Sequence, residues 1–117
     1  MEPGETFQQA LKREIREEAG VEVEILSFIG ICKNLEKNIV NIDFSCRYTG
    51  GILTTSEEST EVIWATEKEA MALITFPLTR KRLANMLKKD REVHLFGFVR
   101  EPFTVFEDET FPAGGLE

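Results

Sequence analysis

The hydrophobic residues near the start of the chain recur at steps of three and four positions. They are Phe7, Ala10, Leu11 and Ile15, and most of the residues between them are good helix formers. This spacing predicts an amphipathic helix of about four turns whose apolar stripe lies on a sheet. Gly20 follows as the expected left-handed stop of that helix.

Further along the chain, apolar and polar residues alternate with the period of two that is typical of half-buried strands. The first alternating segment changes phase near Ile25, which predicts a bulge there. The predicted strands and extended segments are 21–30, 42–48, 62–65, 93–99 and 103–106, with a polar hairpin loop over 34–38.

Two more helices are expected in the second half of the chain. Thr66 and Glu69 form a capping box that opens a helix running to about Ile74. Pro77 is expected to break the chain before a helix over 79–89, and the tail over 107–117 is expected to be turn-like. The order of these predicted elements indicates an α/β protein, folded as a single domain over 1–117.

Length and charge narrow the classes of function. A chain of 117 residues can bury one core, and 42% hydrophobic with 30% charged residues is typical of a soluble globular protein. The net charge of −7 argues against a nucleic-acid partner, since domains that bind phosphate backbones are usually basic. An anionic substrate would therefore need metal ions or a local basic patch.

The sequence gives no sign of export or of a membrane partner. Its apolar runs are too short to span a bilayer, and its first residues do not form a signal peptide. Cys32 and Cys46 lack the spacing of a metal site, so we expect two free thiols and a cytoplasmic location.

Three acidic residues of the first helix share one side of it. Glu14, Glu17 and Glu18 stand at i, i+3 and i+4, so their carboxylates project close together. Arg13 offsets part of their repulsion, by about 0.2–0.5 kcal/mol. Mg²⁺ would offset more, because it prefers oxygen ligands and is often shared with substrate phosphates. The simpler alternative is a solvated acidic helix face.

The spacing of these residues matches a known pattern. From Glu5, seven residues lead to Arg13-Glu14-Ile15, then to Glu17-Glu18 and Gly20-Val21. This resembles the box of the Nudix hydrolases, G-x5-E-x7-R-E-U-x-E-E-x-G-U, where U is a bulky aliphatic residue. The fixed positions match by chance on the order of once per ten million starting points. The box occupies residues 4–21 of this chain.

The resemblance implies the fold and chemistry of MutT-like Nudix hydrolases. The implied fold is an α/β/α sandwich with a mixed sheet. The implied activity is hydrolysis, with Mg²⁺ or Mn²⁺, of a phosphoanhydride bond in a nucleoside diphosphate linked to another group, so the partner is a small nucleotide-type molecule. The implied catalytic residues are Glu14, Arg13 and Glu17; the implied metal ligands are Glu14, Glu17 and Glu18, with Glu5 and Glu58 as further candidates.

Several of these residues have simpler interpretations. Glu5 at a helix start is also favoured by the helix dipole. Glu58 is preferred over Glu57 and Glu61 as an extra ligand, against the alternative of a solvated acidic loop. Arg80, Lys81 and Arg82 could contact phosphates or be merely solvated. Trp64 and Phe76 could stack a base, but we expect core positions for both.

The box lacks its first glycine, because the chain begins four residues before Glu5, where six are needed. The strands that precede the box in the family are therefore expected to be missing at this end, and an open sheet edge would favour a homodimer. Residues 111–117, FPAGGLE, look like the segment that precedes Pro3 in the family. In a circularly permuted chain they could complete the box of the same chain. In a shortened chain they could complete the box of a neighbouring chain, or complete none. The likeness could also be accidental. A non-catalytic domain that binds nucleotide or protein is the alternative function.

Overall fold

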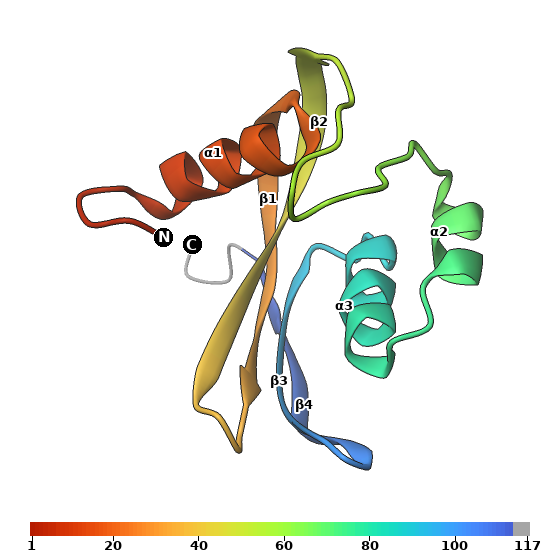
Figure 1. Ribbon diagram of the computed structural model, residues 1–117. Helices are drawn as coiled ribbons and strands as arrows, with labels where there is room; N and C mark the ends of the chain where they lie inside the picture. The colour runs from red at the N-terminus through yellow and green to blue at the C-terminus, as the bar shows by residue number, and fades with distance from the viewer. Residues whose placement is uncertain (114–117) are drawn as a thin grey trace. The chain divides into compact units, whose positions relative to one another are not determined.

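The first helix forms as the sequence predicts. In the computed structural model, which describes residues 1–113, α1 spans Phe7–Ala19 (Figure 1). Thr6 Oγ1 accepts a hydrogen bond from the backbone N–H of Gln9 at 3.1 Å, and the Gln9 side chain accepts one from the Thr6 N–H at 2.9 Å. Ala10 is buried, whereas Phe7 at the start of the predicted apolar stripe is 56% exposed.

Gly20 ends α1 in the expected left-handed conformation. Its φ is 77°, and its N–H donates to the carbonyl oxygen of Arg16 at 2.9 Å. A Cβ atom at Gly20 would lie 2.5 Å from the carbonyl oxygen of Ile52. The glycine therefore serves both the helix stop and the close approach of the chain that follows the second strand.

We expect Gly20→Ala to lower the free energy of unfolding by about 2–4 kcal/mol, because the substitution adds left-handed strain and a clash with backbone. Urea denaturation measures this directly. Gly50→Ala is the matched control, since a Cβ at Gly50 meets no atom within 4 Å. Equal stabilities for the two variants would contradict the role assigned to Gly20.

Four strands form one mixed sheet. They are β1 (Val21–Asn34), β2 (Ile39–Gly51), β3 (Glu92–Arg100) and β4 (Phe103–Pro112), in the order β2-β1-β3-β4. β1 pairs with β3 in parallel, with Gly30 opposite His94, and β3 pairs with β4 antiparallel. The predicted α/β class with a mixed sheet is confirmed, and so is the hairpin loop between the first two strands.

The two later helices also form, and both ends of α3 lie two residues earlier than expected. α2 spans Glu67–Leu73 and begins with the predicted capping box of Thr66 and Glu69. α3 spans Pro77–Leu87, so it starts two residues before the expected position. Pro77, expected to be a break, stands at the first turn, where its fixed φ suits a helix and its missing N–H costs nothing.

Two segments differ from the sequence-based prediction. Residues 62–65 form no strand. β4 continues to Pro112, although 107–112 was expected to be turn-like. Glu107 has a φ of 51°, next to a shift of the β3–β4 register between Leu95 and Gly97. This irregularity interrupts the alternation of apolar and polar residues along β4. Residues 114–117, on which the question of a completed box depends, lie outside the described residues.

The chain divides into two compact units. The first contains residues 1–27 and 46–64, and the second contains 28–45 and the described residues from 65 onward. The second has a buried cluster of Cys32, Phe96 and Phe98, around which Leu78, Phe103 and Val105 pack. The expectation of a single domain stays a prediction.

Other features of the chain agree with the sequence-based picture. Cys32 and Cys46 are both free, and burial raises the pKa of each thiol. His94 is buried in the second unit, with 2% of its surface exposed. Within residues 1–113, no helix is long and apolar enough to cross a membrane.

Candidate active site

Arg13 organises the acidic residues at the start of the chain. Its Nε donates to Glu5 Oε2 at 2.7 Å and its Nη2 to Glu5 Oε1 at 3.0 Å, which is a bidentate pair. Its Nη1 donates to Glu17 Oε2 at 3.1 Å. The hydrogen bonds from Arg13, and a further one from the N–H of Glu2, lower the pKa of Glu5 from 4.5 to about 2. Glu5 in turn raises the pKa of Arg13, so both groups stay charged.

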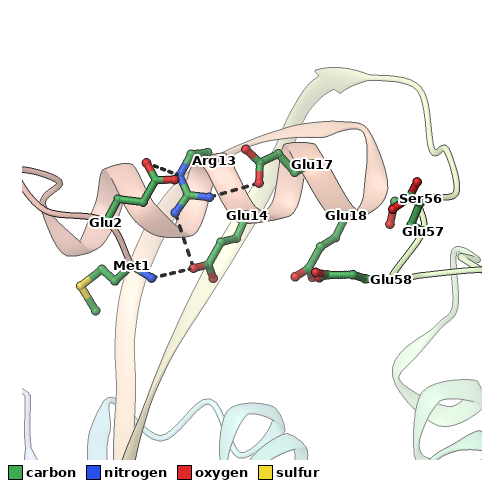
Figure 2. A pocket seen from close by; sticks show the side chains of 9 residues that line it. All are labelled: Met1, Glu2, Arg13, Glu14, Glu17, Glu18, Ser56, Glu57 and Glu58. Carbon is green, nitrogen blue, oxygen red and sulfur yellow. Dashed lines mark hydrogen bonds and ion pairs between the residues drawn. The ribbon is translucent and has the colours of Figure 1, made fainter.

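An acidic cavity lies between α1 and the loop after β2, within the first unit (Figure 2). Its volume is about 450 Å³. The lining residues are Met1, Glu2, Arg13, Glu14, Glu17, Glu18, Ser56, Glu57 and Glu58. Six of the nine are glutamates, against one guanidinium and one terminal ammonium, so the cavity carries an excess of negative charge that attracts cations.

The glutamates line this cavity from three segments, namely the turn before α1, α1 itself and the loop after β2. Figure 2 shows Glu14 and Glu18 extending from α1, and Glu58 extending from the loop into the same space as Glu18. Glu17 lies above them, turned toward Arg13. The Met1 ammonium nitrogen is 3.4 Å from Glu14 Oε1. The Glu18 side chain makes no hydrogen bond or ion pair with any residue from 1 to 113, so its carboxylate is available to a ligand.

The donor set fits a hard divalent cation. Carboxylate oxygens from two sides of one cavity are the ligands that Mg²⁺ and Mn²⁺ prefer. Among residues 1–113, no three His, Cys, Asp or Glu side chains are already arranged as a metal cluster. A cation would therefore have to draw the exposed glutamates together, against their mutual repulsion.

A hydrogen-bonded turn presents the two loop glutamates. The Ser56 N–H donates to the carbonyl oxygen of Ser59 at 2.9 Å, and Ser56 Oγ accepts from the Ser59 N–H at 3.0 Å. Glu57 and Glu58 occupy the middle of this turn. The N–H of Thr54 donates to the carbonyl oxygen of the last residue of α1 at 2.8 Å, which ties the loop to the helix.

We expect Ser56→Ala to weaken Mn²⁺ binding about tenfold, because removing a group that orients a ligand typically costs that much. Isothermal titration calorimetry measures the affinity. Ser56→Asn is the control, because Asn keeps a side-chain acceptor that suits the first position of a turn. Wild-type affinity in Ser56→Ala would show that the turn does not position Glu58.

The structure brings most of the sequence-predicted site residues to this cavity. Arg13, Glu14, Glu17, Glu18 and Glu58 all line it, although their individual roles stay predictions. Two candidates are absent from the described lining, namely Glu5 and Glu61. Glu5, only 17% exposed at its side chain, has both oxygens bound to Arg13, so the contacts favour a positioning role over metal ligation.

Sequence reasoning missed three of the lining residues. Glu2 and Met1 reach the cavity through the turn that precedes α1. Ser56 had a usable signal, because Ser at the first position of a four-residue turn is favoured on physical grounds. Its spacing to Ser59 could have predicted the turn that carries Glu58.

The cationic cluster at 80–82 has structural partners in the second unit. Arg80 Nη1 donates to carbonyl oxygens at the end of α2, one of them at 2.8 Å. Lys81 Nζ is 2.7 Å from Asp108 Oδ2, and Arg82 Nε lies 3.0 Å from both oxygens of Asp43. These contacts account for all three charges without a phosphate.

The expectation that Trp64 and Phe76 are core residues is wrong. Trp64 is 63% exposed and Phe76 is 68% exposed. Apolar side chains contribute much of any protein surface, so ring size alone does not establish burial. Both rings are therefore open to solvent.

Comparison with known proteins identifies the family. Residues 1–89 match the NUDIX domain, which is more than half of the chain. The chain therefore belongs to the Nudix family, as the resemblance of residues 4–21 implied.

Two relatives match parts of the chain. It is 41% identical over 69 residues to a MutT-like protein of Streptomyces ambofaciens, covering 59% of this chain and 45% of that protein. It is 44% identical over 59 residues to the human 8-oxo-dGDP phosphatase NUDT18, covering 50% of this chain and 18% of that protein. The chain thus spans less than half the length of each of these relatives.

A solved structure has the same fold. The MutT protein from Bacillus halodurans superposes with a TM-score of 0.68, covering 94% of this chain and 76% of that one. Since only 20% of the aligned residues are identical, the likeness concerns the fold alone.

Proposed function

We propose that this chain hydrolyses a phosphoanhydride bond in a nucleoside diphosphate linked to another group, with Mg²⁺ or Mn²⁺ as cofactor. The observation that carries the proposal is the convergence of glutamates from α1 and from the 56–59 turn on one cavity beside Arg13. Membership of the Nudix family supports it, and so does the phosphatase activity named for the human relative. The products would be a nucleotide and a phosphate-bearing moiety.

The lining residues have different roles in such a reaction. Glu17 and Glu18 hold the cation, and Glu58 joins them from the loop. When bound, the divalent cation neutralises the diphosphate and lowers the pKa of a bound water. Glu14 serves as a further ligand or as the base that accepts a proton from the attacking water. Arg13 keeps Glu5 and Glu17 in place by its hydrogen bonds.

Direct attack by water is favoured over a covalent intermediate. Ser56 is the one hydroxyl-bearing side chain among the described residues lining the cavity, and its Oγ is engaged with the Ser59 N–H. Within residues 1–113, Ser56 Oγ donates no hydrogen bond to a carboxylate, His or Lys that could activate it. A serine without a base partner is a weak nucleophile.

A substrate panel tests the proposal. Purified protein is incubated with Mg²⁺ or Mn²⁺ and nucleoside triphosphates, ADP-ribose, dinucleotides, nucleotide sugars or 8-oxo-dGDP, and phosphate-containing products are separated by chromatography. We expect at least one compound to be hydrolysed, with metal-dependent turnover. Folded protein that releases no product from any member of the panel would contradict the proposal and favour a non-catalytic binding domain.

The remaining expectations concern the cellular location, the partner and the oligomeric state. A cytoplasmic location and a small-molecule partner suit a nucleotide substrate. β2 and β4 are the edge strands of the described sheet, so homodimerisation through a sheet edge stays a prediction. Size-exclusion chromatography with mass measurement distinguishes a monomer from a dimer.

A further inference from the structure

The two loop glutamates of the cavity belong to a long segment without helix or strand. This acidic loop spans residues 52–63, between Gly51 at the end of β2 and Trp64. A loop of this length can place its middle in many positions unless its ends are held, because each free residue adds conformational entropy. The placement of Glu58 beside Glu18 therefore depends on the contacts at the two ends of the acidic loop.

Tyr48 contacts the residues at both ends of the acidic loop. Its hydroxyl donates a hydrogen bond to the carbonyl oxygen of Gly51 at 2.5 Å. Its ring meets the Trp64 ring edge to face, with ring centroids 5.1 Å apart and planes at 73°. Tyr48 itself is absent from the described lining of the cavity. One side chain outside the cavity thus closes the acidic loop at its base.

The first end of the acidic loop is packed against the end of α1. Gly51 has a φ of 85°, and a Cβ atom there would lie 2.5 Å from the carbonyl oxygen of Gly20. The hydrogen bond from the Thr54 N–H to the carbonyl oxygen of Ala19 follows three residues later. Because Ala19 is next to Glu18, these contacts hold the loop against the segment that carries that carboxylate.

Little chain separates these contacts from Glu58. Glu58 follows Thr54 by four residues, so their Cα atoms are at most about 14 Å apart. The 56–59 turn is hydrogen-bonded within itself, which leaves Thr55 as the single residue between Thr54 and the turn. A displacement of Gly51 or Thr54 would therefore reach Glu58 as a movement of the whole turn.

We propose that Tyr48 is a positioning residue of the cation site, which holds both ends of the acidic loop so that Glu58 meets the carboxylates of α1. This inference rests on the proposed function, because it concerns the same cation site. The hydroxyl keeps Gly51 on the end of α1, and the ring restricts the movement of Trp64. Tyr48 thereby raises the affinity for Mg²⁺ or Mn²⁺ without contacting the ion.

Calorimetric titration with Mn²⁺ tests the role of the hydroxyl. Tyr48→Phe keeps the ring and removes the hydrogen bond to Gly51, so we expect about fivefold weaker binding, the usual net contribution of one hydrogen bond. Thr104→Val is the matched control and should bind as wild type, because it removes a hydroxyl that donates to the carbonyl oxygen of Pro102 at 3.1 Å in the second unit. Equal affinity in Tyr48→Phe and Thr104→Val would overturn the proposal.

A larger substitution tests the role of the ring. Tyr48→Ala also removes the edge contact with Trp64 and should weaken Mn²⁺ binding about a further fivefold. Circular dichroism checks that the variant is folded. A folded Tyr48→Ala that binds Mn²⁺ as tightly as Tyr48→Phe would overturn the role of the ring, and an unfolded one leaves the decision to Tyr48→Phe.

A double-mutant cycle separates positioning from a general effect on the fold. In a background of Glu57→Gln and Glu58→Gln, the turn offers no carboxylate to the cavity. Adding Tyr48→Phe to that background should cause no further loss of Mn²⁺ affinity. The same fivefold loss there would mean that Tyr48 does not act through the loop glutamates, and would overturn the proposal.

Paramagnetic broadening of amide NMR signals shows which segment moves. With substoichiometric Mn²⁺, the signals of residues 56–58 should broaden less in Tyr48→Phe than in the wild type, relative to those of residues 14–18. A general loss of stability would not change this ratio. An unchanged ratio in Tyr48→Phe would overturn the positioning of the loop by Tyr48.

These measurements need no turnover, so this proposal and the proposed function can fail separately. Weaker Mn²⁺ binding by Tyr48→Phe, without hydrolysis of any compound in the panel by the wild type, would support the positioning role and contradict the hydrolase assignment. Metal-dependent hydrolysis by the wild type, with unchanged Mn²⁺ affinity in Tyr48→Phe, would support the hydrolase and overturn the positioning role.

Discussion

Replacing Glu18 with Gln is expected to lower kcat about a thousandfold while leaving the fold intact. The substitution keeps the shape of the side chain but removes the charge that holds a divalent cation. Loss of that interaction raises the free energy of the transition state by several kcal/mol. An increase of about 4 kcal/mol corresponds to a thousandfold lower kcat. The Glu18 side chain has no hydrogen-bond or ion-pair partner within residues 1–113. Its replacement should therefore change the free energy of unfolding by less than about 0.5 kcal/mol. Steady-state kinetics and thermal unfolding measure the two effects.

The control for Glu18→Gln is Glu61→Gln. Glu61 belongs to the same unit and is exposed, but it is absent from the described lining of the cavity. The same loss of one negative charge there should leave kcat unchanged. If both variants, or neither, lost activity, net charge or another group would be responsible and the assignment of Glu18 would fail.

Arg13→Lys is expected to lower kcat by about 10²-fold, although it keeps the positive charge. A lysine ammonium cannot reproduce the fork that binds both oxygens of Glu5 while also reaching Glu17. A misplacement of about 1 Å in a reacting group is sufficient for a loss of this size. Steady-state kinetics at saturating Mg²⁺ tests it, and wild-type kcat in Arg13→Lys would contradict the positioning role.

The same variant has a predicted pH signature. In the wild type, Arg13 lowers the pKa of Glu5 from 4.5 to about 2, so the Glu5 carboxylate stabilises the fold fully above pH 4.5. That contribution declines as the pH falls toward 2, where Glu5 takes up a proton. In Arg13→Lys the pKa of Glu5 should rise toward 4.5, which NMR titration of its carboxyl carbon can follow. An unchanged Glu5 titration would mean that Arg13 is not the cause of the shift.

The parts of the fold set by local rules could be predicted from the sequence. The predicted capping box at Thr66 satisfies backbone N–H groups within four residues, and the left-handed backbone at position 20 favours glycine. The grouping of the α1 glutamates follows from helical periodicity alone. These features depend on neighbours in sequence, so their signals survive without tertiary information.

The missed features depend on contacts between distant residues. β4 continues past Phe106 because its backbone pairs with β3, while its Glu107–Thr110 side chains face solvent and show no apolar alternation. Trp64 is 63% exposed although its type favours burial, and the Tyr48 ring of β2 meets it only edge to face. Likewise, the partners of Arg82 and Lys81 lie 39 and 27 positions away, so sequence reading could not separate them from phosphate ligands.

The central claim is that the carboxylates of α1 and of the loop after β2 form one site that binds a divalent cation. Paramagnetic broadening by Mn²⁺ tests it most directly, because amide NMR signals close to the bound ion disappear first. At substoichiometric Mn²⁺ we predict selective loss of signals from residues 14–18 and 56–58, reversed by excess Mg²⁺ and strongly reduced in Glu18→Gln. Broadening centred on other residues, or spread evenly along the chain, would contradict the account.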